Sequence, residues 1–130
     1  MSNEISQLNA QVLAFIGDSV YTLYVREQML NLPKNKSNVL HSHANKYVSA
    51  VGQSISIEKI LPLLNDEEVA VFKRARNYKT ASTAKHSTVS EYKRATGFEA
   101  VIGYLYLTKQ TERLNEIMKK SMEALDESRG

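Results

Sequence analysis

Two acidic residues, Asp18 and Glu99, each stand beside glycine or alanine inside an apolar stretch, residues 14–20 and 96–106. Charged side chains are rarely buried among apolar residues unless they have a partner. If helices carrying these two stretches crossed at their small residues, the two carboxylates would meet. Two negative charges a few ångströms apart require a cation or a shared proton between them.

Magnesium suits a pair of this kind. It prefers oxygen ligands, keeps several waters, and binds through one or two carboxylates together with substrate phosphate. A bound ion lowers the pKa of water and stabilises charge on a phosphodiester. Glycine inside a helix costs about 1 kcal/mol relative to alanine, so Gly17 and Gly103 need a compensating close approach. The pattern therefore indicates a candidate Mg²⁺ site at Asp18 and Glu99.

Each acid also has a simpler interpretation. Thr96 and Glu99 have the spacing of a capping box, in which Glu99 would close the N-terminus of a helix. Asp18 would then be a solvated helix residue, and the two glycines would serve helix packing alone. The local pattern leaves both interpretations open.

The elements that would position these acids are all predicted to be helices. An apolar stripe with helical spacing marks the expected core face of the first helix, which should end near Leu30, ahead of Pro33. The stripe consists of Leu8, Val12, Phe15, Ile16, Ser19, Val20 and Leu23.

Capping residues and apolar periodicity predict the remaining helices, and Asn65 with Glu68 and Thr88 with Glu91 have the spacing of capping boxes. One helix begins at Ser37, and a second covers 56–64 with a break at Pro62. A third runs from Asn65 through Ala75, a fourth begins at Thr88, and the last two cover 98–107 and 111–127. Residues 77–87 are polar and are predicted to form a loop. No stretch alternates as a strand would, so the expected fold is all-α.

Length and composition bound the class of protein. The chain has 130 residues, 42% of them hydrophobic, as expected for a single globular domain. It has no cysteine, which excludes a disulfide framework and agrees with a reducing compartment. No signal peptide or membrane span is apparent, so we expect a cytoplasmic protein. The net charge of +3 is compatible with an anionic partner.

Positive charge is concentrated in residues 73–94, where Glu91 is the only acid. Affinity for a nucleic-acid duplex comes mainly from neutralised phosphates, and A-form RNA is contacted through phosphates and 2′-hydroxyls. The candidate RNA-binding residues are Lys73, Arg74, Arg76, Asn77, Lys79, Lys85 and His86. By itself, such a basic run is more often a solvated face.

Residues 14–21 resemble the signature helix of the ribonuclease III catalytic domain, and residues 98–107 resemble its second acidic helix. The similarity is closest to the Mini-III ribonucleases, which consist of that domain alone, and it covers about residues 7–125. Residues 73–79 resemble the entry to their basic loop.

The resemblance implies one all-α catalytic domain over residues 1–130, without a separate double-stranded-RNA-binding domain. It also implies a homodimeric, magnesium-dependent endoribonuclease that cleaves double-stranded RNA and matures precursor 23S ribosomal RNA. Asp18 and Glu99 match the signature acids, and the resemblance makes them catalytic residues and metal ligands. The family pairs the signature helices of two protomers. The apolar edge formed by Tyr21, Tyr24 and Val25 fits that interface or a broader core.

The chain departs from full-length ribonuclease III proteins at positions that usually carry acids. Gln11 and Ala14 stand seven and four residues before Asp18, and Thr96 stands three before Glu99. The Mini-III branch is similarly reduced, so more of the metal coordination must come from water and RNA phosphate. The missing acids also leave an alternative open: a non-catalytic double-stranded-RNA-binding or ribosome-assembly protein on the same fold.

Overall fold

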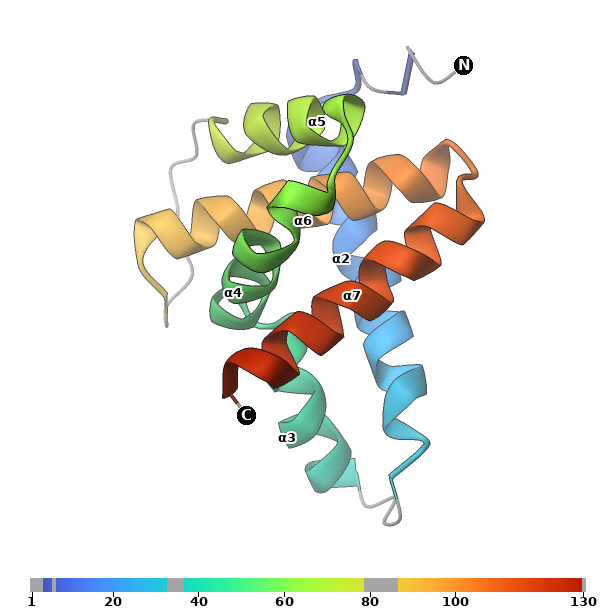
Figure 1. The fold of residues 1–130 in the computed structure, drawn as a ribbon, viewed down its shortest axis with the longest axis vertical. Coiled ribbons are helices and arrows are strands. Elements are labelled where there is room, and N and C mark those ends of the chain that lie inside the picture. The colour runs from blue at the N-terminus through green and yellow to red at the C-terminus, as the bar shows by residue number, and fades with distance from the viewer. Residues whose placement is uncertain (1–3, 6, 33–36, 79–86, 130) are drawn as a thin grey trace.

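The computed structural model describes residues 4–5, 7–32, 37–78 and 87–129, and its regular elements are helices (Figure 1). They are α2 (Ala10–Met29), α3 (Ser37–Val48), α4 (Ala50–Ile60), the 3₁₀ turn η1 (Leu61–Leu63), α5 (Asp66–Arg76), α6 (Val89–Leu107) and α7 (Thr111–Arg129). No strand occurs in these ranges, which confirms the all-α prediction. None of the helices there has both the length and the apolar composition of a membrane span.

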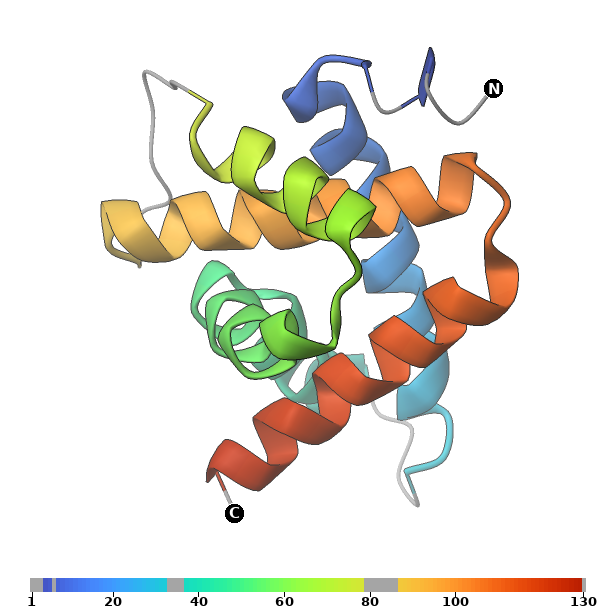
Figure 2. The same cartoon turned by 45° about the horizontal axis from the view of Figure 1, so that its top comes forward.

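Helix α6 forms the centre of the fold. Figure 2 shows it running between α5 and α4, with α2 crossing it and α7 lying across α4. Its buried side chains include Phe98, Val101, Ile102 and Leu105, each fully inaccessible to solvent. A helix that is apolar around most of its circumference must be covered by neighbours on several sides. Glu99 is therefore carried on a helix that neighbours cover on several sides.

Two predicted capping boxes are confirmed. Glu68 N donates to Asn65 Oδ1 at 2.9 Å, and Asn65 N donates to Glu68 Oε1 at 2.9 Å, at the start of α5. Thr88 and Glu91 exchange the same pair of hydrogen bonds at the start of α6. Each box satisfies backbone N–H groups that a helix N-terminus leaves without partners.

The capping interpretation of Glu99 is wrong. Helix α6 is continuous from Val89 to Leu107, so no helix begins at residue 98. Thr96 lies inside it, and its Oγ1 donates to the Tyr92 carbonyl oxygen at 3.0 Å. Glu99 is consequently a side chain in the middle of a buried helix.

The fourth helix begins earlier than predicted. Ser49 Oγ accepts a hydrogen bond from Gly52 N at 3.1 Å, and α4 starts at Ala50 rather than residue 56. The break at Pro62 is confirmed, because η1 follows α4 there. Residues 50–55 carry no apolar stripe since the buried face of α4 is partly polar, and its buried polar residues are Gln53, Ser54 and Ser56.

The apolar stripe on α2 does not mark the core face, which corrects the prediction. Phe15 and Leu23 are 73% and 62% exposed, and Leu8 and Val12 are exposed as well. The core face instead carries Leu13, Tyr21 and Val25, so Tyr21 and Val25 belong to a broader core. Periodicity identified an apolar face, but the helix has two of them and only one packs inward.

Candidate active site

Helices α2 and α6 cross at Gly17 and Gly103. A Cβ atom built on Gly17 would lie 1.7 Å from the Glu99 carbonyl oxygen, and one built on Gly103 would lie 2.0 Å from the Leu13 carbonyl oxygen. No side chain fits at either position, because real Cβ atoms essentially never approach closer than 3.0 Å. The two backbones therefore touch at the point where each helix carries its acid.

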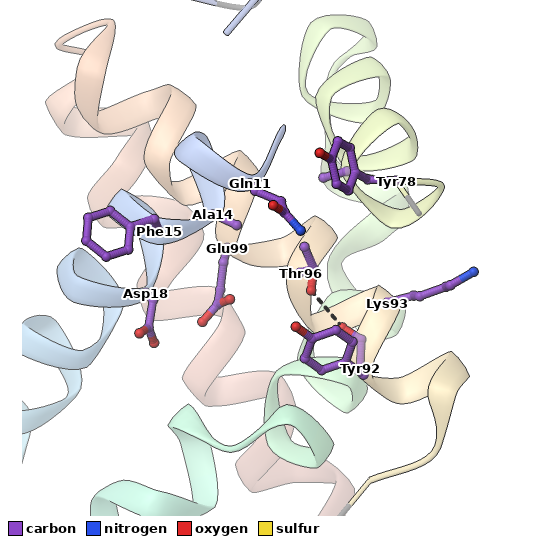
Figure 3. Close-up of a pocket in the computed structure, with 10 residues that line it drawn as sticks. Gln11, Ala14, Phe15, Asp18, Tyr78, Tyr92, Lys93, Thr96 and Glu99 are labelled. Atoms are coloured by element: carbon purple, nitrogen blue, oxygen red, sulfur yellow. Dashed lines mark hydrogen bonds between the residues drawn. The ribbon is translucent and has the colours of Figure 1, made fainter. Parts of the chain in front are cut away.

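This crossing brings Asp18 and Glu99 to one cavity of about 210 Å³. Figure 3 shows both carboxylates directed toward the same side of that cavity, one from α2 and one from α6. Asp18 is exposed to solvent, whereas Glu99 is partly buried. The two acids therefore lie at the boundary between the packed helices and the solvent. A polar substrate can reach Asp18 without any rearrangement of the helices.

Burial, followed by a hydrogen bond with Asp18 and the charge of Asp18, raises the pKa of Glu99 to about 9, while a hydrogen bond from Gln53 opposes the rise. In the metal-free protein, Glu99 is therefore protonated near neutral pH. A cation between the two carboxylates would take the place of that proton. This is the electrostatic signature expected of two facing acids.

The donor set fits a hard divalent cation. Asp18 and Glu99 supply carboxylate oxygens, and the described residues contain no group of three or more His, Cys, Asp or Glu side chains that could hold a metal. Gln11, Ala14 and Thr96 line the same cavity, so these three departures from the acidic pattern fall at this site. Magnesium tolerates this arrangement because it commonly binds through one or two carboxylates, water and phosphate.

The predicted RNA-binding residues separate into three groups. Lys73 is exposed on the last turn of α5. Arg74 Nη2 donates to the Leu8 carbonyl oxygen at 2.7 Å, which ties α5 to the segment before α2. Arg76 Nε donates to Asn77 Oδ1 at 3.2 Å, and its guanidinium lies over the Phe72 ring. The remaining three, Lys79, Lys85 and His86, lie outside the described residues.

Sequence reasoning missed two features of this site. Tyr92 and Lys93 line the cavity, although the sequence placed them only within a basic region. Gln53 is buried and its Nε2 donates to Glu99 Oε2 at 3.3 Å. The sequence contains no local signal for the contact between Gln53 and Glu99, because the two residues are 46 positions apart.

Comparison with known proteins identifies relatives over nearly the whole chain. The profile of the Ribonuclease III domain family matches residues 11–110. A Mini-ribonuclease 3 of Clostridium tetani is 45% identical over 96% of this chain and 83% of its own length. A Mini-ribonuclease 3 of Enterococcus faecalis is 40% identical over 96% of both chains. A crystal structure of a Fusobacterium nucleatum protein superposes with a TM-score of 0.81, at 34% identity over 90% of this chain and 93% of that one.

Proposed function

This chain belongs to the ribonuclease III family, in its Mini-ribonuclease 3 branch, and we propose that Asp18 and Glu99 hold a Mg²⁺ ion with which it cleaves double-stranded RNA. As a member of that family the chain is an endoribonuclease. The observation that carries the proposal is the meeting of the two carboxylates in one cavity at the glycine crossing. Membership in a family of ribonucleases also weighs against the non-catalytic alternative.

Magnesium bound there would supply an activated water and positive charge beside the scissile phosphodiester. The chain's own contribution is to fix the two carboxylates on rigid helices and to keep them on the same side of one cavity. Glu99 must release its proton before it can serve as a ligand, because metal binding needs the ionised carboxylate. Asp18, being exposed, faces the side from which the RNA backbone arrives.

Basic residues around the cavity would hold the RNA phosphates. Lys93 lines the cavity wall, and Lys73 is exposed at the end of α5. We propose that Asn77, Lys79, Lys85 and His86, which follow α5 in the sequence, also contact the RNA. Phosphate contacts of this kind fix the register of a duplex and make binding salt-dependent, without reading its sequence. Arg74 and Arg76 are partly engaged inside the protein, so we assign them a smaller share of that binding.

The exposed apolar face of α2 supports a homodimer. Leu8, Val12, Phe15 and Leu23 are all exposed, and Leu23 lines a groove together with the exposed Tyr106. Exposed apolar side chains along one helix favour an interaction site, and a two-fold axis would bring the same face of two subunits together. Phe15 also lines the active-site cavity, so this interface would adjoin the catalytic acids.

Precursor 23S ribosomal RNA in the cytoplasm is the substrate that we propose. Its base-paired regions would supply A-form duplex, whose wide minor groove displays the phosphates and 2′-hydroxyls that a basic surface can contact. Such a surface recognises shape more than sequence, so the choice of cleavage site within the precursor would depend on the folded RNA.

The test is cleavage of an end-labelled RNA duplex with Mg²⁺ and with EDTA, beside single-stranded RNA of the same sequence and a DNA duplex. The proposal predicts cutting of the RNA duplex alone, and only with Mg²⁺. A transcript containing the base-paired ends of precursor 23S RNA should be cut at discrete positions. Equal cutting of single strands, or cutting in EDTA, would contradict the substrate class or the metal requirement.

A further inference from the structure

Gln53 is a buried polar residue that touches one of the two acids directly. It is 1% exposed, and its Nε2 lies 3.3 Å from Glu99 Oε2 and 3.2 Å from the Val48 carbonyl oxygen. The first contact is at the long end of the N–H···O range. Contacts at catalytic sites are often long without substrate and tighten in the complex.

The Val48 contact determines which end of the Gln53 amide faces Glu99. A backbone carbonyl oxygen can only accept hydrogen bonds, so the nitrogen of the amide must point toward it. That nitrogen carries two N–H donors, and the second is directed at Glu99 Oε2. The arrangement therefore offers a donor to the carboxylate, which favours its ionised form and a single orientation.

The backbone that carries Gln53 is itself tightly fixed. Ser49 caps the start of α4 through Gly52 N, and a Cβ atom on Gly52 would lie 1.9 Å from the Lys46 carbonyl oxygen. The end of α3 and the start of α4 are thus in backbone contact. Gln53 follows directly in the first turns of α4, so its amide is anchored by its own hydrogen bond and by its helix.

We propose that Gln53 is a positioning residue, which holds Oε2 of Glu99 so that the rest of the carboxylate is presented to a divalent cation shared with Asp18. This inference rests on the proposed metal-binding role of the two acids. A carboxylate has about four lone-pair sites, so one hydrogen bond from Gln53 leaves capacity for the cation. Hydrogen-bond partners of this kind orient ligands, and removing one typically weakens metal affinity by about 10- to 100-fold.

Ser56 supplies a matched control on the same helix. It is fully buried, and its Oγ donates to the Ser121 carbonyl oxygen at 2.9 Å, so it joins α4 to α7 instead of α6. Ser56→Ala removes one buried side-chain hydrogen bond from α4, and Gln53→Met removes the two that the Gln53 amide donates to Val48 and Glu99. Methionine keeps the length of the glutamine side chain but cannot donate. A general loosening of α4 would affect both variants alike.

The experiment measures Mg²⁺ binding to the RNA-free protein by isothermal titration calorimetry, with circular dichroism and thermal unfolding as checks of folding. We expect Gln53→Met to raise the dissociation constant for Mg²⁺ by about tenfold or more, and Ser56→Ala to leave it unchanged. Cleavage by Gln53→Met should recover toward the wild-type rate at saturating Mg²⁺. A dissociation constant within about twofold of the wild-type value in Gln53→Met would overturn the inference.

Asp18→Asn separates failure of this inference from failure of the proposed function. If Asp18→Asn still binds Mg²⁺ like the wild type, the metal site itself is misplaced and the role of Gln53 falls with it. If Asp18→Asn abolishes binding and Gln53→Met does not weaken it, only the positioning role is wrong.

A measurement on the wild-type side chain covers the case in which Gln53→Met does not fold. The side-chain amide resonances of Gln53 should shift when Mg²⁺ is added to the wild type, and should not shift in Asp18→Asn. They should also move in Glu99→Gln, where an amide replaces the carboxyl group that accepts the hydrogen bond from Gln53. Resonances unaffected by both Mg²⁺ and Glu99→Gln would overturn the inference.

Discussion

Gly17 and Gly103 lie at a backbone-to-backbone contact between α2 and α6. A Cβ atom on Gly17 would clash with the Glu99 carbonyl, and a Cβ atom on Gly103 would clash with the Leu13 carbonyl. Asp18 directly follows the first glycine, and Glu99 lies one helical turn before the second. The close crossing is therefore what brings two acids, distant in sequence, to one cavity.

Replacing Gly17 by alanine should damage both stability and activity. The new methyl group meets backbone, which cannot rotate away, so the helices must separate. Overpacking of this kind typically costs about 1–3 kcal/mol in the free energy of unfolding. Urea unfolding and duplex cleavage would measure the two effects. Ser19→Ala, an exposed position on the same helix, should leave both near wild type, and a stable, fully active Gly17→Ala would contradict the crossing.

The pair of acids should make the metal-free protein lose stability as pH rises. The pKa of Glu99 is raised from 4.5 to about 9 in the folded state. Between these values the folded protein binds more protons than the unfolded chain, so the contribution of Glu99 is fully present below pH 4.5 and is lost as pH rises through about 9. Urea unfolding in EDTA across this range should show the decline, and Glu99→Gln should flatten it. Identical slopes in the two proteins would contradict the buried, protonated state of Glu99.

A charge on the exposed face of α2 should dissociate the proposed dimer. Leu23→Glu would place a carboxylate in the apolar patch, where pairing of two copies would bury two unpaired charges. Analytical ultracentrifugation should find the wild type dimeric and Leu23→Glu monomeric at the same concentration. Val89→Glu is the matched control, because Val89 is an exposed apolar residue on α6 that lines none of the cavities described. A dimeric Leu23→Glu, or a monomeric wild type, would remove this face from the interface.

The basic segment after α5 should set the salt dependence of RNA binding. Replacing both Lys79 and Lys85 by alanine removes two candidate phosphate-neutralising charges, so RNA binding should weaken. The slope of the logarithm of the binding constant against the logarithm of the salt concentration should fall by about one for each charge that no longer contacts a phosphate. Filter binding of catalytically inactive protein at several salt concentrations would measure it. Lys59 and Lys109, which do not line the cavity, give a double replacement with the same charge change. An unchanged slope would exclude the segment from the interface.

Local features of this fold could be predicted from sequence, because neighbouring residues determine them. The Asn65–Glu68 and Thr88–Glu91 capping boxes depend on residues three positions apart and were predicted correctly. The crossing at Gly17 was predicted for a different reason, since a glycine inside a helix needs compensation that close backbone contact supplies.

Other features that depend on distant partners could not be predicted. Hydrophobic periodicity reports an apolar face but not what covers it, so Phe15 and Leu23 were assigned to a core that they do not enter. The start of α4 was missed because Gln53 and Ser56 are buried polar residues whose hydrogen-bond partners lie on α6 and α7. Only the tertiary structure shows that Thr96 lies mid-helix, which excludes a capping role for Glu99.

The most direct test of the account is single-turnover cleavage of an RNA duplex by Asp18→Asn, with binding of the same duplex measured in parallel. A metal ion contributes several kcal/mol of transition-state stabilisation, and about 1.4 kcal/mol corresponds to a tenfold change in rate. We therefore expect the rate of Asp18→Asn to fall by about a thousandfold or more, while its folding and its affinity for the duplex stay near wild type. Cleavage at the wild-type rate would contradict the assignment of Asp18 as a ligand of the catalytic metal.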